Sequence, residues 1–280
     1  MSWFVEQLHE HARQQLSIDE VLYEGRTDFQ DLIVFRNGTF GRVMALDGAV
    51  QVTEADEFAY HEMMSHVPLF AHGAAKDVLI IGGGDGGLLR EVLRHPVERV
   101  TEVELDAGVV EATKRHMPFI CGEAYDDPRT DLVIGDGARY VAETDNRFDV
   151  ILVDSTDPVG PGEILFSRGF YADCKRCLKP GGVLVTQNGV PFMQGEELRK
   201  SVGHFRELFA DAACYLVSVP TYVNGDMALG WASLDPALRQ VDAGTLRARY
   251  ESAGLKTRYY NPEVHIASFA LPNYVRDLIR

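Results

Sequence analysis

Apolar runs that alternate with helical stretches begin at about residue 73. The runs are DVLIIGGG, RVTEVELD, TDLVIGDG, FDVILVD and GGVLVTQN, and helical spacing fills the intervals near 87–95, 106–116, 136–144 and 166–178. Continuous apolar strands separated by helices are typical of a parallel sheet covered on both faces. Two later runs, CYLVSVP and DMALGWAS, lie close together and predict an antiparallel edge. We therefore predict a doubly wound, Rossmann-like α/β domain over residues 73–280.

The chain before residue 73 has a different pattern. Alternating apolar positions over about residues 18–52 predict short strands, with hairpin signals at Asn37-Gly38 and Asp47-Gly48. Thr53 is a candidate N-cap for a helix whose apolar spacing runs up to Pro68. Residues 1–72 are therefore predicted to form a small N-terminal β-hairpin domain with a linking helix.

Composition and charge narrow the possible partners. The 280 residues carry 42 acids against 27 Lys and Arg, for a net charge of −15. No basic cluster marks a nucleic-acid site, whereas an acidic balance suits a small cationic partner. No apolar run reaches the ~18 residues of a membrane span. The polar start MSWFVEQLHEHARQQ lacks the pattern of a signal or transit peptide. We expect a cytoplasmic protein without a membrane or nucleic-acid partner.

Two short patterns raise the question of a metal. Cys174 and Cys177 form a C-x-x-C, but no second ligand pair accompanies them, and their helical context predicts buried packing positions. A redox role for this pair stays open. His61-Glu62 begins an H-E-x-x-H-like pattern, yet the next histidine, His66, lies five residues on and about 140° around the helix. We expect no metal site.

A glycine-rich loop joins the first apolar run to the helix after it. Gly82, Gly84 and Gly87 satisfy G-x-G-x-x-G directly between the strand VLII and the helix LLREVLRH. Such glycines let a ligand approach the backbone and the helix N-terminus closely. Glu104 follows Gly82 by 22 residues, at the end of the next strand, where an acid can bind ribose hydroxyls. The context predicts a ligand that contains a nucleoside.

Acids at neighbouring strand ends indicate the charge of that ligand. Asp85 stands inside the glycine loop, Asp136-Gly137 follows the third run, and Asp154 follows the fourth. These charges would oppose a pyrophosphate and favour a cationic nucleoside such as a sulfonium derivative of adenosine, as in methyltransferase-like folds. If Asp85 points at the tail of the sulfonium, it would repel an amino-acid carboxylate and attract a bare aminopropyl ammonium.

Five longer segments carry a family resemblance: IIGGGDGGLLREVLRH, EVELDAGVV, DDPRTDLVIGDG, DVILVDSTDPVGPGEILF and YYNPEVHIASFALP. It extends to FGRVMALDGAVQVTEADEFAYHEMM near the start and so covers nearly the whole chain. Through these segments the chain resembles the spermidine synthase (polyamine aminopropyltransferase) family of bacteria. The implied reaction joins putrescine to the aminopropyl group of decarboxylated S-adenosylmethionine, giving spermidine and 5′-methylthioadenosine.

The resemblance also implies roles for particular residues. Asp154 would be the general base that accepts a proton from the attacking amine. The sulfonium compound is a co-substrate, so no cofactor is expected, and the family implies a homodimer or homotetramer. The other implied binding positions are Gln30, Glu104, Asp136, Gly137 and Pro161 for the nucleoside, His61 and Asp85 for the aminopropyl or polyamine part, Ser155, Thr156 and Asp157 beside the diamine, and Tyr60, Gln187 and Tyr222 as further walls.

Simpler interpretations stand beside these roles. Asp154 and Asp136 could cap helices, Glu57 and His61 could form a surface pair, and Tyr222 could pack in the core. A methyltransferase acting on intact S-adenosylmethionine and a non-catalytic polyamine-binding homologue are the alternative functions. The preferred amine length and the choice between dimer and tetramer stay open. We also predict that the loop over about residues 155–164 orders over bound ligand.

Overall fold

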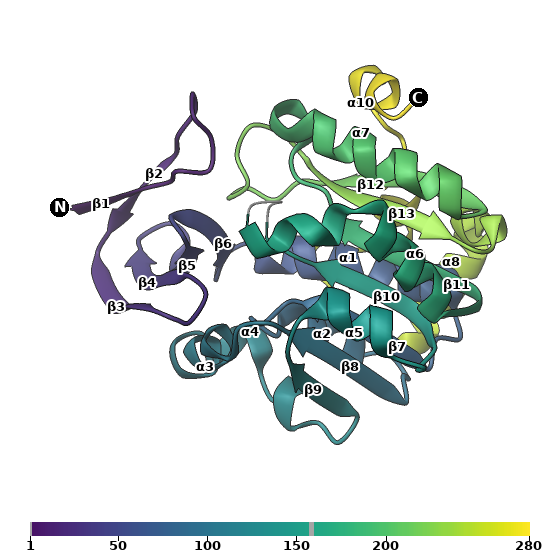
Figure 1. Ribbon diagram of the computed structural model, residues 1–280, viewed down its shortest axis with the longest axis horizontal. Helices are drawn as coiled ribbons and strands as arrows, with labels where there is room; N and C mark the ends of the chain where they lie inside the picture. The colour runs from purple at the N-terminus through teal and green to yellow at the C-terminus, as the bar shows by residue number, and fades with distance from the viewer. Residues whose placement is uncertain (1, 157–159) are drawn as a thin grey trace.

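The computed structural model describes residues 2–156 and 160–280, without the side chain of Pro161. Its largest element is a seven-stranded sheet (Figure 1). The strand order is β12 (Asp211–Val217), β13 (Met227–Ser233), β11 (Leu178–Gln187), β10 (Phe148–Asp154), β7 (Asp77–Gly82), β8 (Arg99–Glu104) and β9 (Thr130–Ile134). The strands from β11 to β9 are parallel, whereas β13 is antiparallel to both β11 and β12. The predicted parallel sheet and its antiparallel edge are both confirmed.

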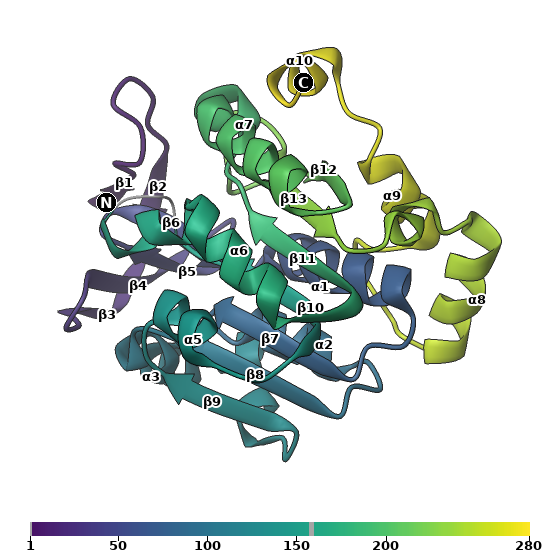
Figure 2. The same ribbon diagram turned by 45° about the vertical axis from the view of Figure 1, so that its right-hand side comes forward.

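Helices cover both faces of this sheet, as Figure 2 shows. Ile80 packs with one face and its chain neighbours Leu79 and Ile81 with the other, which is why these strands are apolar throughout. The first face is covered by α1 (Glu57–His72), α2 (Gly87–Leu93), α8 (Ala243–Ala253) and α9 (Pro262–Ser268), and the second by α5 (Gly137–Glu143), α6 (Arg168–Cys177), α7 (Pro191–Leu208) and α10 (Asn273–Leu278). The doubly wound fold class is thus confirmed.

Further helices and turns complete this part of the chain. They are α3 (Ala107–His116), α4 (Pro118–Cys121) and the 3-10 turns η1 (Ala124–Asp126), η2 (Gly160–Phe166) and η3 (Pro236–Gln240). All four cysteines are free and buried, and burial raises the pKa of Cys174, so the expected packing positions are confirmed. None of the described helices is long and apolar enough to cross a membrane.

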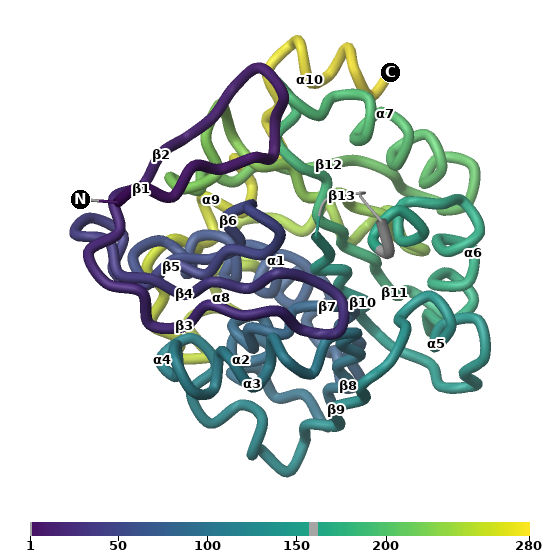
Figure 3. The backbone as a smooth tube through the Cα atoms, turned by 60° about the vertical axis from the view of Figure 1, so that its left-hand side comes forward, coloured from purple at the N-terminus to yellow at the C-terminus, as the bar shows by residue number. Residues whose placement is uncertain are grey.

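The N-terminal strands form two antiparallel sheets. One pairs β1 (Ser2–Val5) with β2 (Gln15–Ile18), and the other orders β3 (Glu20–Arg26), β4 (Asp31–Asn37), β5 (Gly41–Leu46) and β6 (Ala49–Thr53). Asp47 and Gly48 have φ of 46° and 78°, as the predicted two-residue hairpin requires. Strands β1 and β2 begin earlier than predicted, because their short segments lack a sustained alternation. Apolar residues of this domain pack against α3 and α4, so it covers one end of the large sheet (Figure 3).

The predicted linking helix differs from expectation at both ends. Asp56, not Thr53, precedes α1, and Pro68 lies inside the helix, which continues to His72 and ends at Gly73 with φ of 75°. Proline removes one helical hydrogen bond, yet Val67, Leu69 and Phe70 around it are all buried, so their packing holds the helix through this position. The helix contacts α2, and it also contacts the strands β10 and β11 of the large sheet. The division of the chain at residue 72 stays a prediction.

Asp56 joins three parts of the fold. Its Oδ1 accepts the Thr53 hydroxyl at 2.6 Å, at the end of β6, and its Oδ2 accepts the backbone N–H of Thr221 at 2.7 Å, between β12 and β13. The Thr221 hydroxyl also donates to Oδ2. The carboxylate is buried, so these donors replace water as its partners.

We expect Asp56→Ala to lower the free energy of unfolding by about 3 kcal/mol, because it leaves a buried N–H and two hydroxyls without an acceptor. Urea denaturation measures this loss. Asp242→Ala is the matched control: Asp242 is an exposed cap of α8 that accepts from Gly244 and Thr245. Its loss should destabilise the chain much less than the loss of Asp56, because water can replace the exposed cap. Equal losses in the two variants would contradict the role of Asp56 as a junction.

Candidate active site

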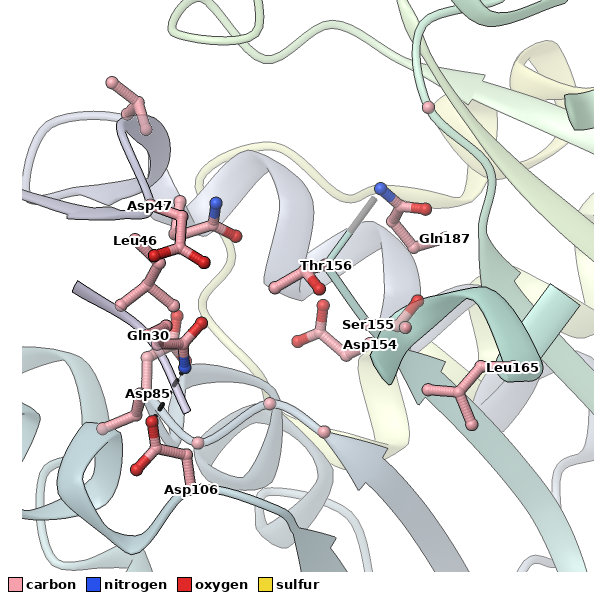
Figure 4. Close-up of a pocket in the computed structure, with 18 of the residues that line it drawn as sticks. Gln30, Leu46, Asp47, Asp85, Asp106, Asp154, Ser155, Thr156, Leu165 and Gln187 are labelled. Carbon is pink, nitrogen blue, oxygen red and sulfur yellow. Dashed lines mark hydrogen bonds between the residues drawn. The ribbon is translucent and has the colours of Figure 1, made fainter. Parts of the chain in front are cut away.

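A cavity of about 270 Å³ lies at the carboxyl ends of β7, β8 and β10, beneath the N-terminal domain. Figure 4 shows Gln30, Leu46 and Asp47 on one side of it, opposite Asp154, Ser155 and Gln187. The predicted site residues that line it are Gln30, Tyr60, His61, Gly82, Gly84, Asp85, Glu104, Asp136, Gly137, Asp154, Ser155, Thr156, Gln187 and Tyr222. Asp157 and the side chain of Pro161 lie outside the described residues. The fold thus brings together positions that are spread over almost 200 residues.

The glycine loop is glycine-rich because three neighbours approach its backbone. A Cβ on Gly82, whose φ is 79°, would lie 2.1 Å from the backbone carbonyl oxygen of Asp154. A Cβ on Gly84 would lie 2.9 Å from the Glu104 carboxyl group, and one on Gly87 2.2 Å from the His61 ring. Gly87 is not among the residues that line the cavity. Its smallness makes room for His61 instead, so the motif positions an acid, an imidazole and a strand end.

Glu104, the last residue of β8, lines the cavity. Its carboxylate accepts the N–H of Gly84 at 3.1 Å and of Asp106 at 2.8 Å. Burial raises the pKa of Glu104 to about 7, although these N–H donors oppose part of the rise. Each carboxylate oxygen keeps a second lone pair, so Glu104 can still accept hydrogen bonds from a ligand in the cavity.

Asp106 is a cavity residue that the sequence reasoning missed. It caps α3 through the Gly108 N–H, and its other oxygen accepts from the Thr27 hydroxyl at 2.6 Å and from Gln30 Nε2 at 2.9 Å (Figure 4). It therefore fixes Gln30 of the N-terminal domain over the end of β8. Its signal was its place two residues after Glu104, immediately before a helix.

Asp136 and Gly137 lie at the next strand end. Asp136 caps α5 by accepting from the N–H groups of Ala138 and Arg139, so the capping interpretation is confirmed, and it lines the cavity as well. A Cβ on Gly137 would lie 2.4 Å from Ile81 Cγ2, so only glycine lets α5 start this close to β7.

Asp154 ends β10 inside the cavity. Its Oδ1 accepts the Tyr60 hydroxyl at 2.7 Å. No helix with a described N-cap begins at Asp154, and the loop that follows it includes residues outside the described ones, so capping of that loop stays an alternative. Burial and the neighbouring Asp85 carboxylate raise the pKa of Asp154 to about 6, while His61 and Tyr60 limit the rise. Among the described residues no hydrogen bond reaches its other oxygen, which lies in the cavity lining and can accept from a ligand. An acid in this state is ionised at neutral pH and can accept a proton.

His61 lies between two carboxylates. Its Nδ1 is 2.7 Å from Glu57 Oε2, and its Nε2 is 3.5 Å from Asp85 Oδ2. Burial alone would lower the pKa of His61, but Asp85 and Glu57 raise it to about 10, so the ring is an imidazolium. Arg90 Nη2 holds Glu57 at 2.9 Å. The surface-pair interpretation is wrong, because the His61 side chain is only 2% exposed.

The remaining predicted wall residues come from other strands. Tyr222 donates its hydroxyl to the Gln51 carbonyl at 2.6 Å, and its ring meets that of Tyr60 edge-to-face at 6.0 Å. Tyr222 therefore both packs and lines the cavity. Gln187 Oε1 and Ser155 Oγ are buried and have no hydrogen-bond partner among the residues that the structure describes. Both residues line the cavity, so these atoms are candidates for ligand contacts.

Comparison with known families identifies this architecture. The model of the "Spermine/spermidine synthase domain" matches residues 57–242, and that of the "Spermidine synthase tetramerisation domain" matches residues 2–54. The polyamine aminopropyltransferase of Ruegeria sp. (strain TM1040) is 57% identical over 99% of this chain and 98% of its own length. The chain belongs to the spermidine synthase (polyamine aminopropyltransferase) family.

Further relatives agree with this assignment. Polyamine aminopropyltransferase 1 of Pseudomonas aeruginosa is 55% identical and covers 100% of this chain and 98% of its own length. The spermidine synthase from Thermotoga maritima has a TM-score of 0.91 and 37% identity over 99% of this chain and 94% of that one. A spermidine synthase in complex with the transition-state analogue AdoDATO has a TM-score of 0.94 and 39% identity, with the same coverage. The predicted family and transferase class are confirmed.

The raised pKa of Asp154 in this aminopropyltransferase-family site has a cost in stability. The pKa of Asp154 is about 6 in the folded chain against an ordinary 3.8. Its contribution to stability is therefore fully present only below the unfolded pKa and is lost as pH rises through about 6. We expect Asp154→Asn, which carries no charge, to raise the free energy of unfolding by about 3 kcal/mol near pH 8. Near pH 4.5 the gain should shrink to about a third.

Urea denaturation of the wild type and of Asp154→Asn at the two pH values measures this difference. The Asn side chain still accepts the Tyr60 hydroxyl, so the comparison isolates the charge. A gain of the same size at both pH values would contradict the assignment, because it would mean that the stabilisation comes from packing rather than from removing a buried charge.

Proposed function

We propose that this chain transfers the aminopropyl group of decarboxylated S-adenosylmethionine to putrescine, producing spermidine and 5′-methylthioadenosine. The observation that carries this proposal is the set of carboxylates around one cavity, the buried Glu104 and the partly buried Asp85 and Asp154, beside a glycine loop. A nucleoside that carries a sulfonium and an ammonium is positively charged, and so is a diamine. Both therefore complement the negative charge of these carboxylates. Relatives named polyamine aminopropyltransferase match along the whole chain.

The donor would occupy the half of the cavity beside β7, β8 and α5. Glu104 would accept ribose hydroxyls there, and Gln30, Asp136 and Gly137 line the same cavity, which supports this part of the proposal. Asp85 would face the aminopropyl ammonium. The carboxylate of intact S-adenosylmethionine would instead meet the negative charges of Asp85 and Asp154, which disfavours it at short range.

Proton transfer is the chemical problem of this reaction. A primary amine has a pKa of about 10.4, so near neutral pH it is protonated and lacks the lone pair that attacks. We assign Asp154 as the acceptor of its proton. The amine nitrogen forms a bond to the methylene next to sulfur, the carbon–sulfur bond breaks, and its electron pair stays on sulfur. The leaving group is a neutral thioether, so this step calls for no metal, cofactor or general acid.

Tyr60, Ser155 and Gln187 complete the acceptor half. The Tyr60 hydroxyl donates to Asp154 Oδ1, which would leave Oδ2 to accept from the amine. The buried oxygens of Gln187 and Ser155 line the same region and suit an ammonium donor. Asp157 is assigned to this half from the sequence resemblance, and Pro161 to the nucleoside half on the same basis.

Assembly and location are further parts of the proposal. A spermidine synthase tetramerisation model matches residues 2–54, and in that domain Trp3 is 54% exposed and Val21 47% exposed. We propose that copies of the chain associate through these strands, as a homodimer or a homotetramer. The four free thiols suit a reducing compartment, and the cytoplasm stays our proposed location.

One assay separates this function from its alternatives. Wild-type protein is incubated with putrescine, cadaverine or spermidine and either decarboxylated or intact S-adenosylmethionine, and products are identified by mass. We expect spermidine and methylthioadenosine from putrescine and the decarboxylated donor. A methylated product from intact S-adenosylmethionine would instead show a methyltransferase, and diamine binding without any product would show a non-catalytic homologue.

In the same assay, Asp154→Asn should lose turnover by about a hundredfold or more, since it removes the proton acceptor. It should still bind methylthioadenosine, measured by calorimetry. The wild-type kcat/KM should fall as pH drops below about 6, where Asp154 becomes protonated. Near-normal turnover in Asp154→Asn would refute the assignment of the base.

Asp85→Asn tests how the site selects its donor. Removing this charge should raise KM for decarboxylated S-adenosylmethionine about tenfold and change KM for putrescine less. Asp47→Asn removes an acid that also lines the cavity, on the N-terminal side, and is the matched control. An equal rise of both KM values in Asp85→Asn would point to general disruption of the cavity rather than to contact with the donor.

A further inference from the structure

Glu102 is a buried acid for which the proposed reaction has no role. It lies on β8, is 0% exposed, and does not line the cavity. Its in-register neighbours on β7 and β9 are Ile80 and Leu132, so the surface of the sheet around it is apolar. None of the ion pairs among the described residues includes Glu102. A charged carboxylate is costly in such surroundings.

One oxygen of Glu102, Oε1, contacts Tyr125, whereas Oε2 is buried without a hydrogen-bond partner among the described residues. The Tyr125 hydroxyl oxygen lies 2.9 Å from the Gly84 carbonyl oxygen and 2.9 Å from Glu102 Oε1. A phenol has one hydroxyl proton, and an ionised carboxylate and a carbonyl are both pure acceptors. With Glu102 ionised, three oxygens would share one proton, and one of the two short contacts would hold none. A second proton on Glu102 gives each contact its own hydrogen bond.

We propose that Glu102 is a protonated carboxylic acid and acts as a positioning residue: its O–H donates to the Tyr125 hydroxyl, whose own proton is donated to the Gly84 carbonyl. Both backbone groups of Gly84 are then held, because its carbonyl accepts from Tyr125 and its N–H donates to Glu104 Oε2 at 3.1 Å. Gly84 belongs to the glycine loop, and Glu104 to the nucleoside wall. We call the chain of hydrogen bonds from Glu102 through Tyr125 to Gly84 the relay. It holds the donor half of the cavity in place, although Glu102 itself does not line the cavity.

The charges around Glu102 favour its proton. Burial raises its pKa well above the ordinary value, and Glu104, Asp85 and Asp154 raise it further, against the opposing effect of the Tyr125 hydroxyl. Lys114 on α3 places its Nζ 4.6 Å from the centre of the Tyr125 ring, over the ring, and no ion pair among the described residues joins it to Glu102. Glu102 therefore adds no negative charge beside Glu104, and Glu104 can ionise near neutral pH.

Infrared difference spectroscopy tests the protonation directly. Spectra of the wild type and of Glu102→Gln are compared near pH 9, where Asp154 and Glu104 are ionised. We expect the C=O stretch of a protonated carboxylic acid in the wild type and its loss in the variant. Absence of that band from the folded wild type, shown by circular dichroism to be intact, would overturn the proposal.

Binding of 5′-methylthioadenosine, measured by calorimetry, tests the positioning role. Glu102→Gln keeps the shape and a donor for Tyr125, so its Kd should stay within about twofold of wild type and its pH dependence should not move. Glu102→Met keeps the bulk without the donor and should raise Kd about fivefold, and Tyr125→Phe, which leaves the Gly84 carbonyl unpaired, should raise it about tenfold or more.

Two outcomes would contradict the relay. A shift of the pH dependence to lower pH in Glu102→Gln would mean that the wild type carries a charge at this position. Equal Kd values for Glu102→Met and Glu102→Gln would mean that the donor is unimportant. This inference rests on the proposed function only for its choice of probe. If wild type fails to bind methylthioadenosine, that function is in doubt, whereas the infrared band still decides the protonation of Glu102.

Discussion

The imidazolium of His61, held between Glu57 and Asp85, is the interaction on which the rest of the site depends. Several carboxylates share one buried cavity, and without a cation among them their mutual repulsion would force protons onto more of them. His61 lowers the pKa of Asp85 and limits the rise at Asp154, so both remain ionised near neutral pH. Arg90 in turn holds Glu57, and this secures the imidazole from the side away from the cavity.

The glycines of the loop leave the space in which the charged side chains can lie this close together. Gly82 lets β10 end against the loop, Gly84 lets the Glu104 carboxylate reach a backbone N–H, and Gly87 makes room for the His61 ring. The N-terminal sheet then closes the cavity through Gln30, which is bound to Asp106 beyond β8. Because the cavity is covered in this way, its effective dielectric constant is below that of water, and each charge interaction inside it is stronger. Shape and electrostatics are therefore set by the same few close contacts.

Much of this could be predicted from the sequence. Continuous apolar runs such as FDVILVD could only be satisfied between two layers of helices, and Asp47-Gly48 required a tight hairpin. Acids at strand ends, Asp85, Asp136 and Asp154, had to meet at one edge because parallel strands end together. The extent of α1 could not be predicted in the same way, since tertiary packing around Pro68 overrides its local preference. The roles of Asp106 and Glu102 also depended on partners distant in the chain.

The sequence by itself determined the doubly wound sheet, the glycine loop and the acidic character of the cavity, because strand periodicity and turn chemistry are local properties. Its motifs also identified the family. Only the tertiary structure decided the state of each acid. Burial raises the pKa of Asp154, and Tyr60 donates a hydrogen bond to it. Asp85 pairs with the His61 imidazolium, and Glu102 is the uncharged acid that contacts Tyr125 next to Gly84. Burial and the nearest opposite charge set a pKa, and both arise from residues that the fold brings together from far apart in the chain.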